Sequence, residues 1–235
     1  MSQPIQGRAA LAIICMIKRR RLQRPGFTLI ELLVVLGILL VASSLMRFHS
    51  SSGLGTALTA SQRIVSGMVQ GARGQALLKG VKSRLIIYSD SSRNLDADKK
   101  LRYLGIIHED GETTNHWFAA TPGTYLPKGI YFDPQLSESN GWIAATTQIE
   151  YPCLQSRSLG DGAEYYHYEF ESDGTTAGDF HNAWLVLRAG VLRPDSTGKL
   201  EVDWTPEPLQ GLKAALILRR VGTTKVNEPN CIDDG

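Results

Sequence analysis

The chain has 235 residues and a mass of 25.8 kDa, enough for one or two domains. Its formal net charge is +2, but residues 1–26 contain six basic and no acidic side chains. The 19 basic and 23 acidic side chains that follow give the rest of the chain a net charge of −4. This mildly acidic body disfavours a general nucleic-acid-binding surface, because such surfaces require clustered Lys and Arg. The three cysteines form no C-x-x-C pair, so nothing supports a thiol-ligated zinc site.

A basic segment precedes a long apolar run near the N-terminus. Five cations lie between residues 18 and 24, and the twenty residues from Phe27 to Met46 contain a single charge, Glu31. A run of this length can cross a hydrocarbon core about 30 Å thick, and the basic cluster is expected to stay in the cytoplasm while the body is exported. A cleaved secretory signal has the same order of segments. The carboxylate inside the run is costly in a bilayer, however, and needs its own explanation. The earlier apolar stretch 9–17 is too short to span, and Met16 offers an alternative start.

The sequence RPGFTLIELLVVLGILLVA (24–42) resembles the class III signal of type IV pilins and type II secretion pseudopilins. That signal is a basic leader ending in glycine, followed by Phe-Thr-Leu-Ile-Glu and an apolar helix. The resemblance implies that a prepilin peptidase cuts between Gly26 and Phe27 and then N-methylates the Phe27 amine. It also implies that Glu31 pairs with the Phe27 amine of a neighbouring subunit, in a low-dielectric groove where opposite charges attract strongly. The alternative is that Glu31 only reaches the lipid headgroups.

A second apolar pattern follows Met46. Spacings of three, four and seven predict one buried stripe on a helix, formed by Leu54, Leu58, Ile64, Val65, Met68, Ala72 and Ala76. The opposite, solvent-facing side is predicted at Arg63, Gln70, Arg73 and Lys79. Glycines lower the helix propensity, so this helix is expected to pack on a sheet. A helix from 27 to 79 would end at Gly80, with fraying or a bend expected at 49–55.

Short runs rich in β-branched and aromatic residues follow the helix, separated by turn-forming residues. They predict strands at 81–89, 101–107, 129–133, 164–170, 183–189 and 212–220, and tight turns at 171–174 and 193–198. No helix-length pattern interrupts them, so the sheet should be antiparallel. The predicted fold is α+β and pilin-like, with a long N-terminal helix packed on a β-sheet head. The predicted segments are a cleaved leader (1–26), a transmembrane and filament-core helix (27–47), an amphipathic helix (48–80) and a β-rich periplasmic head (81–235).

Four stretches of the head resemble the GspH/FimT family, which contains the minor pseudopilin H of type II secretion and its pilus relatives. They are ARGQALLKGVKSRLIIY (72–88), YLPKGIYF (125–132), YEFESDGTTAG (168–178) and LKAALILRRVGTTKV (212–226). This chain departs from the family pattern at Gln75, where Glu is usual, and at Thr223 and Thr224, where arginine is usual. Residues 90–120 and 134–163 look like insertions. Because some pilus relatives resemble DNA receptors through that arginine, its absence disfavours nucleic acid as a partner.

The resemblance implies a minor pseudopilin of a type II secretion pseudopilus. Its expected partners are the prepilin peptidase, other pseudopilins or pilins, and the inner-membrane assembly platform. The expected location is a single pass through the inner membrane, with the N-terminus cytoplasmic and the head periplasmic, and then the periplasmic pseudopilus. Two alternatives stay open: a minor type IV pilin of the FimT/FimU kind, in pilus assembly or DNA uptake, and a membrane-anchored binding protein that does not polymerise.

The exported part offers little support for catalysis. Its histidines, His108, His116, His167 and His181, stand near acids but form no H-E-x-x-H, and the chain has no G-x-S-x-G. We therefore expect no catalytic residue, no metal site and no cofactor, and a protein that is not an enzyme. The segment NLDADKK (94–100) faintly resembles a calcium loop but lacks its glycine and terminal glutamate, so calcium binding stays open.

Two further features have alternative interpretations. In an oxidising compartment, Cys153 and Cys231 are a possible disulfide. It would close a loop of 79 residues counting both ends, worth about 4–4.5 kcal/mol on the chain-entropy model. The sequence does not show whether the two thiols approach each other. The aromatic run YYHYEF (165–170) could form a platform for a sugar or a partner, although packing within the core is the simpler interpretation.

Overall fold

The computed structural model describes residues 28–90, 92, 94–153, 155–196, 198–206 and 209–226. The chain divides into two units, Met1–Leu45 and Met46–Gly235. Helix α1 (Leu29–Lys79) supplies the described part of the first unit and then the first element of the second. It ends as predicted at Gly80, whose φ of +66° suits glycine and whose N–H donates to the carbonyl of Ala76 at 2.8 Å.

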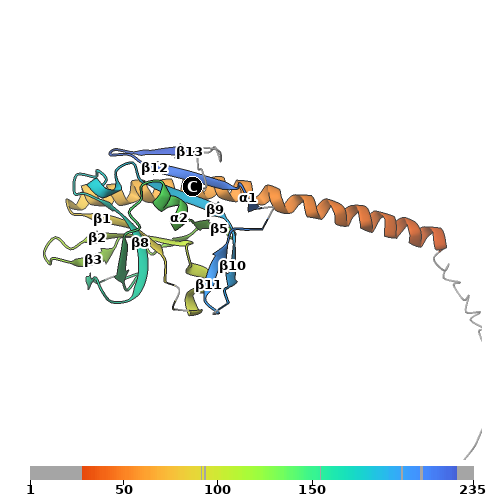
Figure 1. Ribbon diagram of the computed structural model, residues 1–235, viewed down its shortest axis with the longest axis horizontal. Coiled ribbons are helices and arrows are strands. Elements are labelled where there is room, and N and C mark those ends of the chain that lie inside the picture. The colour runs from red at the N-terminus through yellow and green to blue at the C-terminus, as the bar shows by residue number, and fades with distance from the viewer. Residues whose placement is uncertain are drawn as a thin grey trace, which may run out of the picture. The chain divides into compact units, whose positions relative to one another are not determined.

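The second unit is rich in β-strands (Figure 1). The strands are β1 (Ser83–Tyr88), β2 (Tyr103–Glu109), β3 (His116–Ala119), β4 (Thr124–Tyr125), β5 (Ile130–Phe132), β6 (Thr146–Ile149), β7 (Arg157–Ser158), β8 (Ala163–Phe170), β9 (Trp184–Ala189), β10 (Val191–Pro194), β11 (Leu200–Asp203), β12 (Lys213–Leu218) and β13 (Thr223–Val226). The short helices are the 3-10 helices η1 (Asn94–Lys99) and η2 (Gly178–Phe180) and the α-helix α2 (Pro134–Ser139).

The described strands form two main sheets and a hairpin. The larger sheet has the order β6-β8-β1-β2-β3-β7, with β4 also pairing with β2; the smaller has the order β13-β12-β9-β5. Strands β10 and β11 pair only with each other among the described strands. The pairings are antiparallel, as the absence of long crossover helices predicted. A mixed fold of an N-terminal helix and antiparallel sheets is therefore confirmed.

The main core lies between the second part of α1 and both sheets. The helix contributes Leu58, Val65, Val69, Ala72 and Ala76, each less than 9% exposed, and this cluster also contains residues of β1, β2, β5, β8, β9 and β12. Figure 1 shows β12 and β13 along one side of this part of the helix. The predicted apolar stripe is thus the buried face of the helix. Helix α1 includes the stretch 49–55, where fraying or a bend was expected, and Leu54 within it packs against the core.

A second core covers the opposite face of the larger sheet. Alternate residues of a strand point to opposite faces: Leu85 and Ile87 join the main core, whereas Ile86 and Tyr88 join the second cluster. The Tyr88 ring meets the Tyr165 ring edge to face at a centroid distance of 5.4 Å. Strand β1 is therefore buried on both faces, which explains its continuous apolar run.

The prediction for Arg73 was wrong. Arg73 was assigned to the solvent-facing side of the helix, but it is only 5% exposed. Its Nη2 donates to the carbonyls of Arg219 and Arg220, at 2.5 and 3.0 Å, and its guanidinium lies 5.5 Å from the centre of the Phe170 ring. The long side chain is buried because it ties α1 to the turn after β12.

Candidate functional site

The described part of the predicted assembly site is the start of α1. Thr28 is the residue before the helix, and its Oγ1 accepts a hydrogen bond from the backbone N–H of Glu31 at 3.3 Å. In return, the backbone N–H of Thr28 donates a longer hydrogen bond to Glu31 Oε2, at 3.5 Å. This reciprocal pattern is a capping box, which satisfies two of the amides left free at a helix start. Glu31 therefore has a structural partner within its own chain.

The first turns of the helix carry apolar side chains in all directions. Large apolar residues between 29 and 39 are all exposed in the described chain, from 45% for Val35 to 82% for Leu29. A helix that is apolar on every side is normally buried, either in a large core or in lipid. Among the described residues, no helix is both long enough and apolar enough to cross a membrane.

Other residues predicted for processing and cross-linking are only partly described. Gly26, Phe27 and Cys231 lie outside the described residues. Cys153 is buried and forms no disulfide with any cysteine in the described ranges, and its Sγ lies 4.0 Å from the carbonyl oxygen of Trp117. Burial raises the pKa of the Cys153 thiol. The cleavage site and the Cys153–Cys231 disulfide therefore stay predictions.

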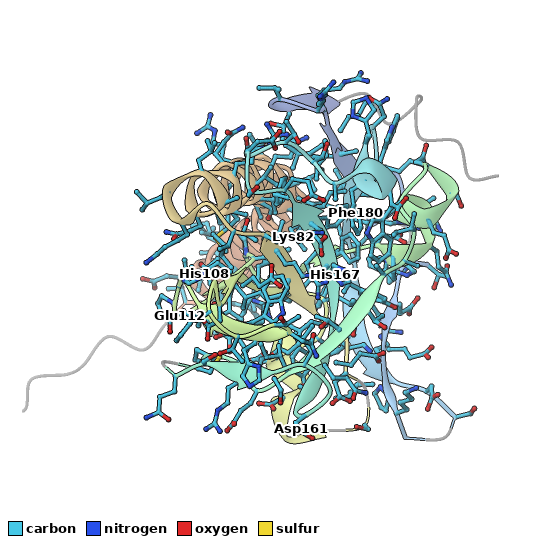
Figure 2. All side chains as sticks on the ribbon, turned by 90° about the vertical axis from the view of Figure 1, so that its left-hand side faces the viewer. Lys82, His108, Glu112, Asp161, His167 and Phe180 are labelled. Atoms are coloured by element: carbon cyan, nitrogen blue, oxygen red, sulfur yellow. The ribbon has the colours of Figure 1, made fainter. Side chains whose placement is uncertain are left out.

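The four histidines of the predicted head do not gather at one place. His108 Nδ1 contacts a backbone carbonyl at 3.0 Å, and His116 Nδ1 contacts another at 3.2 Å. His167 is buried, with its ring centre 5.7 Å from that of Phe180, whereas His181 is exposed. Figure 2 shows His108 and His167 apart from each other. Within the described ranges, no three His, Cys, Asp or Glu side chains are grouped so that they could hold a metal ion.

The segment 94–100, which weakly resembles a calcium loop, contains the 3-10 helix η1. Asp96 Oδ1 lies 2.9 Å from Lys99 Nζ, and Asp98 Oδ1 lies 3.5 Å from Arg102 Nη1. Both carboxylates therefore have a cationic neighbour within four residues in the chain.

Comparison with known proteins identifies the N-terminal segment. Residues 21–46 match the family model of the prokaryotic N-terminal methylation motif. These residues are a type IV pilin-like prepilin signal. The prepilin signal indicates cleavage by a prepilin peptidase, a methylated N-terminus anchored in a membrane, and assembly with other pilins. No curated protein and no solved structure matches the chain. The match ends before the head, so the GspH/FimT resemblance of the head stays a prediction.

Sequence reasoning found Glu31 through the motif but missed its contact with Thr28. The signal for that contact was present, because Ser or Thr followed three residues later by Glu, just before an apolar run, is typical of a capping box.

Proposed function

We propose that this chain is a minor pseudopilin, a structural subunit of a type II secretion pseudopilus. In this proposal, residues 27–47 hold the precursor in the inner membrane. The prepilin peptidase cuts at Gly26–Phe27 and methylates the Phe27 amine, and the subunit then joins a periplasmic filament. The observation that carries the proposal is the prepilin signal at 21–46, which includes the apolar first part of helix α1.

The geometry of Glu31 is consistent with a role in assembly. The contact with Thr28 uses Oε2, and among the described residues Oε1 makes no hydrogen bond. Oε1 can therefore accept the Phe27 ammonium of a neighbouring subunit while the helix cap is kept. In a low-dielectric groove such a pair offsets its desolvation only when both charges are present, so it favours correctly placed subunits.

The exposed apolar side chains from Leu29 to Leu39 support the same proposal. Burial of apolar surface contributes about 25 cal/mol per Å², so these side chains favour either lipid or the interior of a filament over water. The β-rich second unit would then project its surfaces toward partner subunits. We propose no catalytic activity for it and expect the purified full-length chain to show neither hydrolase nor redox activity.

Two substitutions separate the charge of Glu31 from its capping role. Glu31→Gln removes the charge but keeps a side chain that can complete a capping box, whereas Thr28→Val removes the capping hydroxyl and keeps the charge. Thr59→Val is the matched control, because Thr59 Oγ1 donates only to the carbonyl of Gly55 at 3.1 Å on the exposed side of the same helix. Each full-length variant is expressed in cells that contain the prepilin peptidase and the other filament subunits.

The measurements are N-terminal sequencing, membrane fractionation and incorporation into filaments. Wild type should begin at N-methylated Phe27. Glu31→Gln should be cleaved and stay in the membrane, but its incorporation should fall by roughly tenfold or more, as expected for a lost charge pair. Thr28→Val should reduce incorporation less than Glu31→Gln does, and Thr59→Val should leave incorporation unchanged. A mature chain that begins elsewhere would refute the proposal. Normal assembly of Glu31→Gln would instead favour a membrane-anchored binding protein.

A further inference from the structure

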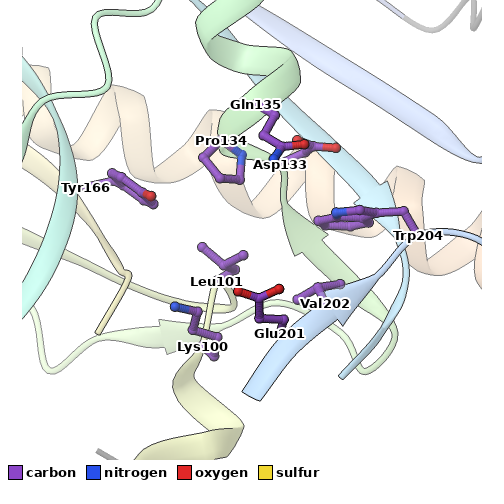
Figure 3. Close-up of a pocket in the computed structure, with 9 residues that line it drawn as sticks. All are labelled: Lys100, Leu101, Asp133, Pro134, Gln135, Tyr166, Glu201, Val202 and Trp204. Carbon is purple, nitrogen blue, oxygen red and sulfur yellow. The ribbon is translucent and has the colours of Figure 1, made fainter. Parts of the chain in front are cut away.

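A small pocket lies in the second unit, between the start of α2, strand β11 and the residues after η1. Its volume is about 170 Å³. Typical pockets for drug-sized ligands measure roughly 300–1,000 Å³, so this pocket limits a ligand to about one ring. Figure 3 shows Tyr166 and Trp204 on opposite sides of the pocket, with Gln135 on one wall and Lys100 and Glu201 on the facing wall.

The aromatic walls are held in place by their own neighbours. Trp204 meets the Tyr131 ring edge to face at 6.3 Å, and the Arg188 guanidinium lies 5.4 Å from the centre of its ring. Tyr166 meets the Trp142 ring edge to face at 5.1 Å. These contacts fix both walls before a ligand arrives, which lowers the entropy cost of binding.

The floor of the pocket is strained. Leu101 is 6% exposed and has a φ of +54°, a left-handed conformation that non-glycine residues adopt rarely. Its N–H donates to the carbonyl of Tyr88 at 2.9 Å, and its carbonyl accepts from the N–H of Phe132 at 2.8 Å. Strained backbone of this kind persists where the surroundings impose it, and it clusters at ligand sites.

The pocket presents hydrogen-bond donors and acceptors that have no partner within the described residues. These are the Glu201 carboxylate, the Gln135 amide, the Tyr166 hydroxyl and the Trp204 indole N–H. Lys100 donates one of its three N–H groups to the carbonyl of Ser89, which leaves two for a ligand. A ligand that fills the pocket must therefore both donate and accept hydrogen bonds.

The charges of the pocket cancel. Asp133 lines the pocket, but its Oδ2 lies 3.5 Å from Arg188 Nη1 and its Oδ1 caps α2 through the N–H of Leu136. Lys100 and Glu201 have opposite charges. An anion would meet the carboxylates and a cation would meet Lys100, so neither is favoured. A purely apolar side chain would bury the free polar groups without partners, which is unfavourable.

We propose that this pocket binds a single neutral sugar ring, such as a hexopyranose residue of a glycan outside the cytoplasm. A pyranose has apolar C–H groups on both faces of its ring, and these can pack on Tyr166 and Trp204 on opposite sides of the pocket and on Leu101. Its hydroxyl groups both donate and accept, which matches Glu201 and Gln135. The inference does not depend on filament assembly, because every residue of the pocket belongs to the second unit.

The test uses the full-length chain in lauryldimethylamine oxide micelles, a detergent without a sugar headgroup. D-glucose, D-galactose and N-acetyl-D-glucosamine are titrated separately, and binding is followed by saturation-transfer NMR. Glu201→Gln replaces the carboxylate by an amide of the same shape, Tyr166→Phe removes only the hydroxyl, and Trp204→Phe removes the indole N–H together with one of the two fused rings. Glu112→Gln is the control, because Glu112 is an exposed carboxylate outside this pocket. Thermal unfolding of each variant verifies that it is folded.

At least one of the three sugars should bind saturably. Each pocket variant should weaken that binding by about three- to tenfold, the effect of one lost hydrogen bond, and Glu112→Gln should leave it unchanged. Absence of saturable binding of all three sugars would overturn the proposal, as would binding that all three pocket variants leave unchanged. Efficient photocross-linking from a benzophenone side chain at position 135 to another protein subunit would also overturn it, because the pocket would then be a protein-docking site.

Discussion

His167 provides a test of how tightly the second unit is packed. It lies on β8 opposite Ile86 of β1 and is 7% exposed, and its buried Nδ1 has no hydrogen-bond partner in the described structure. Burial, together with the smaller effect of the positive charge of Arg84, lowers its pKa from 6.5 to about 4, whereas Glu169 acts in the opposite direction. The folded protein therefore keeps His167 neutral well below the pKa that it has in the unfolded chain.

The consequence is a loss of stability in acid. Above pH 6.5 the residue is neutral in both states and contributes no pH dependence. Between pH 6.5 and about 4, the unfolded chain takes up a proton that the folded chain does not, so the free energy of unfolding falls as the pH falls. One pKa unit corresponds to 1.36 kcal/mol, so the whole shift is worth about 3 kcal/mol, complete near pH 4.

The assay is urea unfolding of the full-length chain in detergent at several pH values between 7 and 4.5. The variant His167→Gln should be less sensitive to acid than wild type, and the difference in unfolding free energy between the two should change by about 2–3 kcal/mol over this range. Taking the difference between the two unfolding free energies at each pH cancels the contribution of the carboxylates, which both proteins share. His181→Gln is the control, because His181 is exposed. A difference between wild type and His167→Gln that stays constant with pH would refute the burial argument.

Two further predictions concern packing. Arg73→Met should lower the free energy of unfolding, measured with denaturant, by about 1–3 kcal/mol, because two carbonyls lose their buried donor. The control Arg63→Met, on the exposed face of the same helix, should change the free energy of unfolding by less than about 0.5 kcal/mol. An equal effect of the two would contradict the tie between α1 and the turn. Gly105→Ala should destabilise by about 1–3 kcal/mol, because its methyl group would overlap the Tyr151 ring. Gly74→Ala places a methyl group in open space on α1 and should stabilise the protein by about 0.5–1 kcal/mol in the same assay. If Gly74→Ala destabilised the protein more than Gly105→Ala, the close contact between Gly105 and Tyr151 would be contradicted.

The sequence predicted best where burial is complete. Six strands were expected from apolar and aromatic runs, and β1, β2, β5, β8, β9 and β12 lie at those places. The tight turns were also recognisable, since the N–H of Gly174 donates to the carbonyl of Glu171 and that of Gly198 to Asp195. Strands buried on one or both faces need a continuous or alternating apolar pattern, and that pattern is readable without a structure.

Elements at the surface were missed because they are short and do not need a long apolar pattern. Strands β10 and β11 have only four residues each, none of them fully buried, so the short alternation of Leu200 and Val202 with Glu201 and Asp203 is a weak signal. Helix α2 has only six residues, too few for a helical pattern, although Asp133 followed by Pro134 is a recognisable helix start. Arg73 was misplaced because its partners, the carbonyls of Arg219 and Arg220, are distant in sequence. Polarity alone does not reveal such a partner.

The two sites of this chain differ in how far a sequence can reveal them. The predicted assembly site is local: Gly26, Phe27, Thr28 and Glu31 lie within six residues, so a sequence motif can include all of them. The pocket is not local, because its residues come from four separate segments between Lys100 and Trp204 that only the folded second unit brings together. A change at the assembly site should therefore leave the pocket intact, and the reverse should also hold. If Glu31→Gln, which we expect to impair assembly, also abolished sugar binding by the isolated full-length chain, this independence would be wrong, and the two units would have to be coupled.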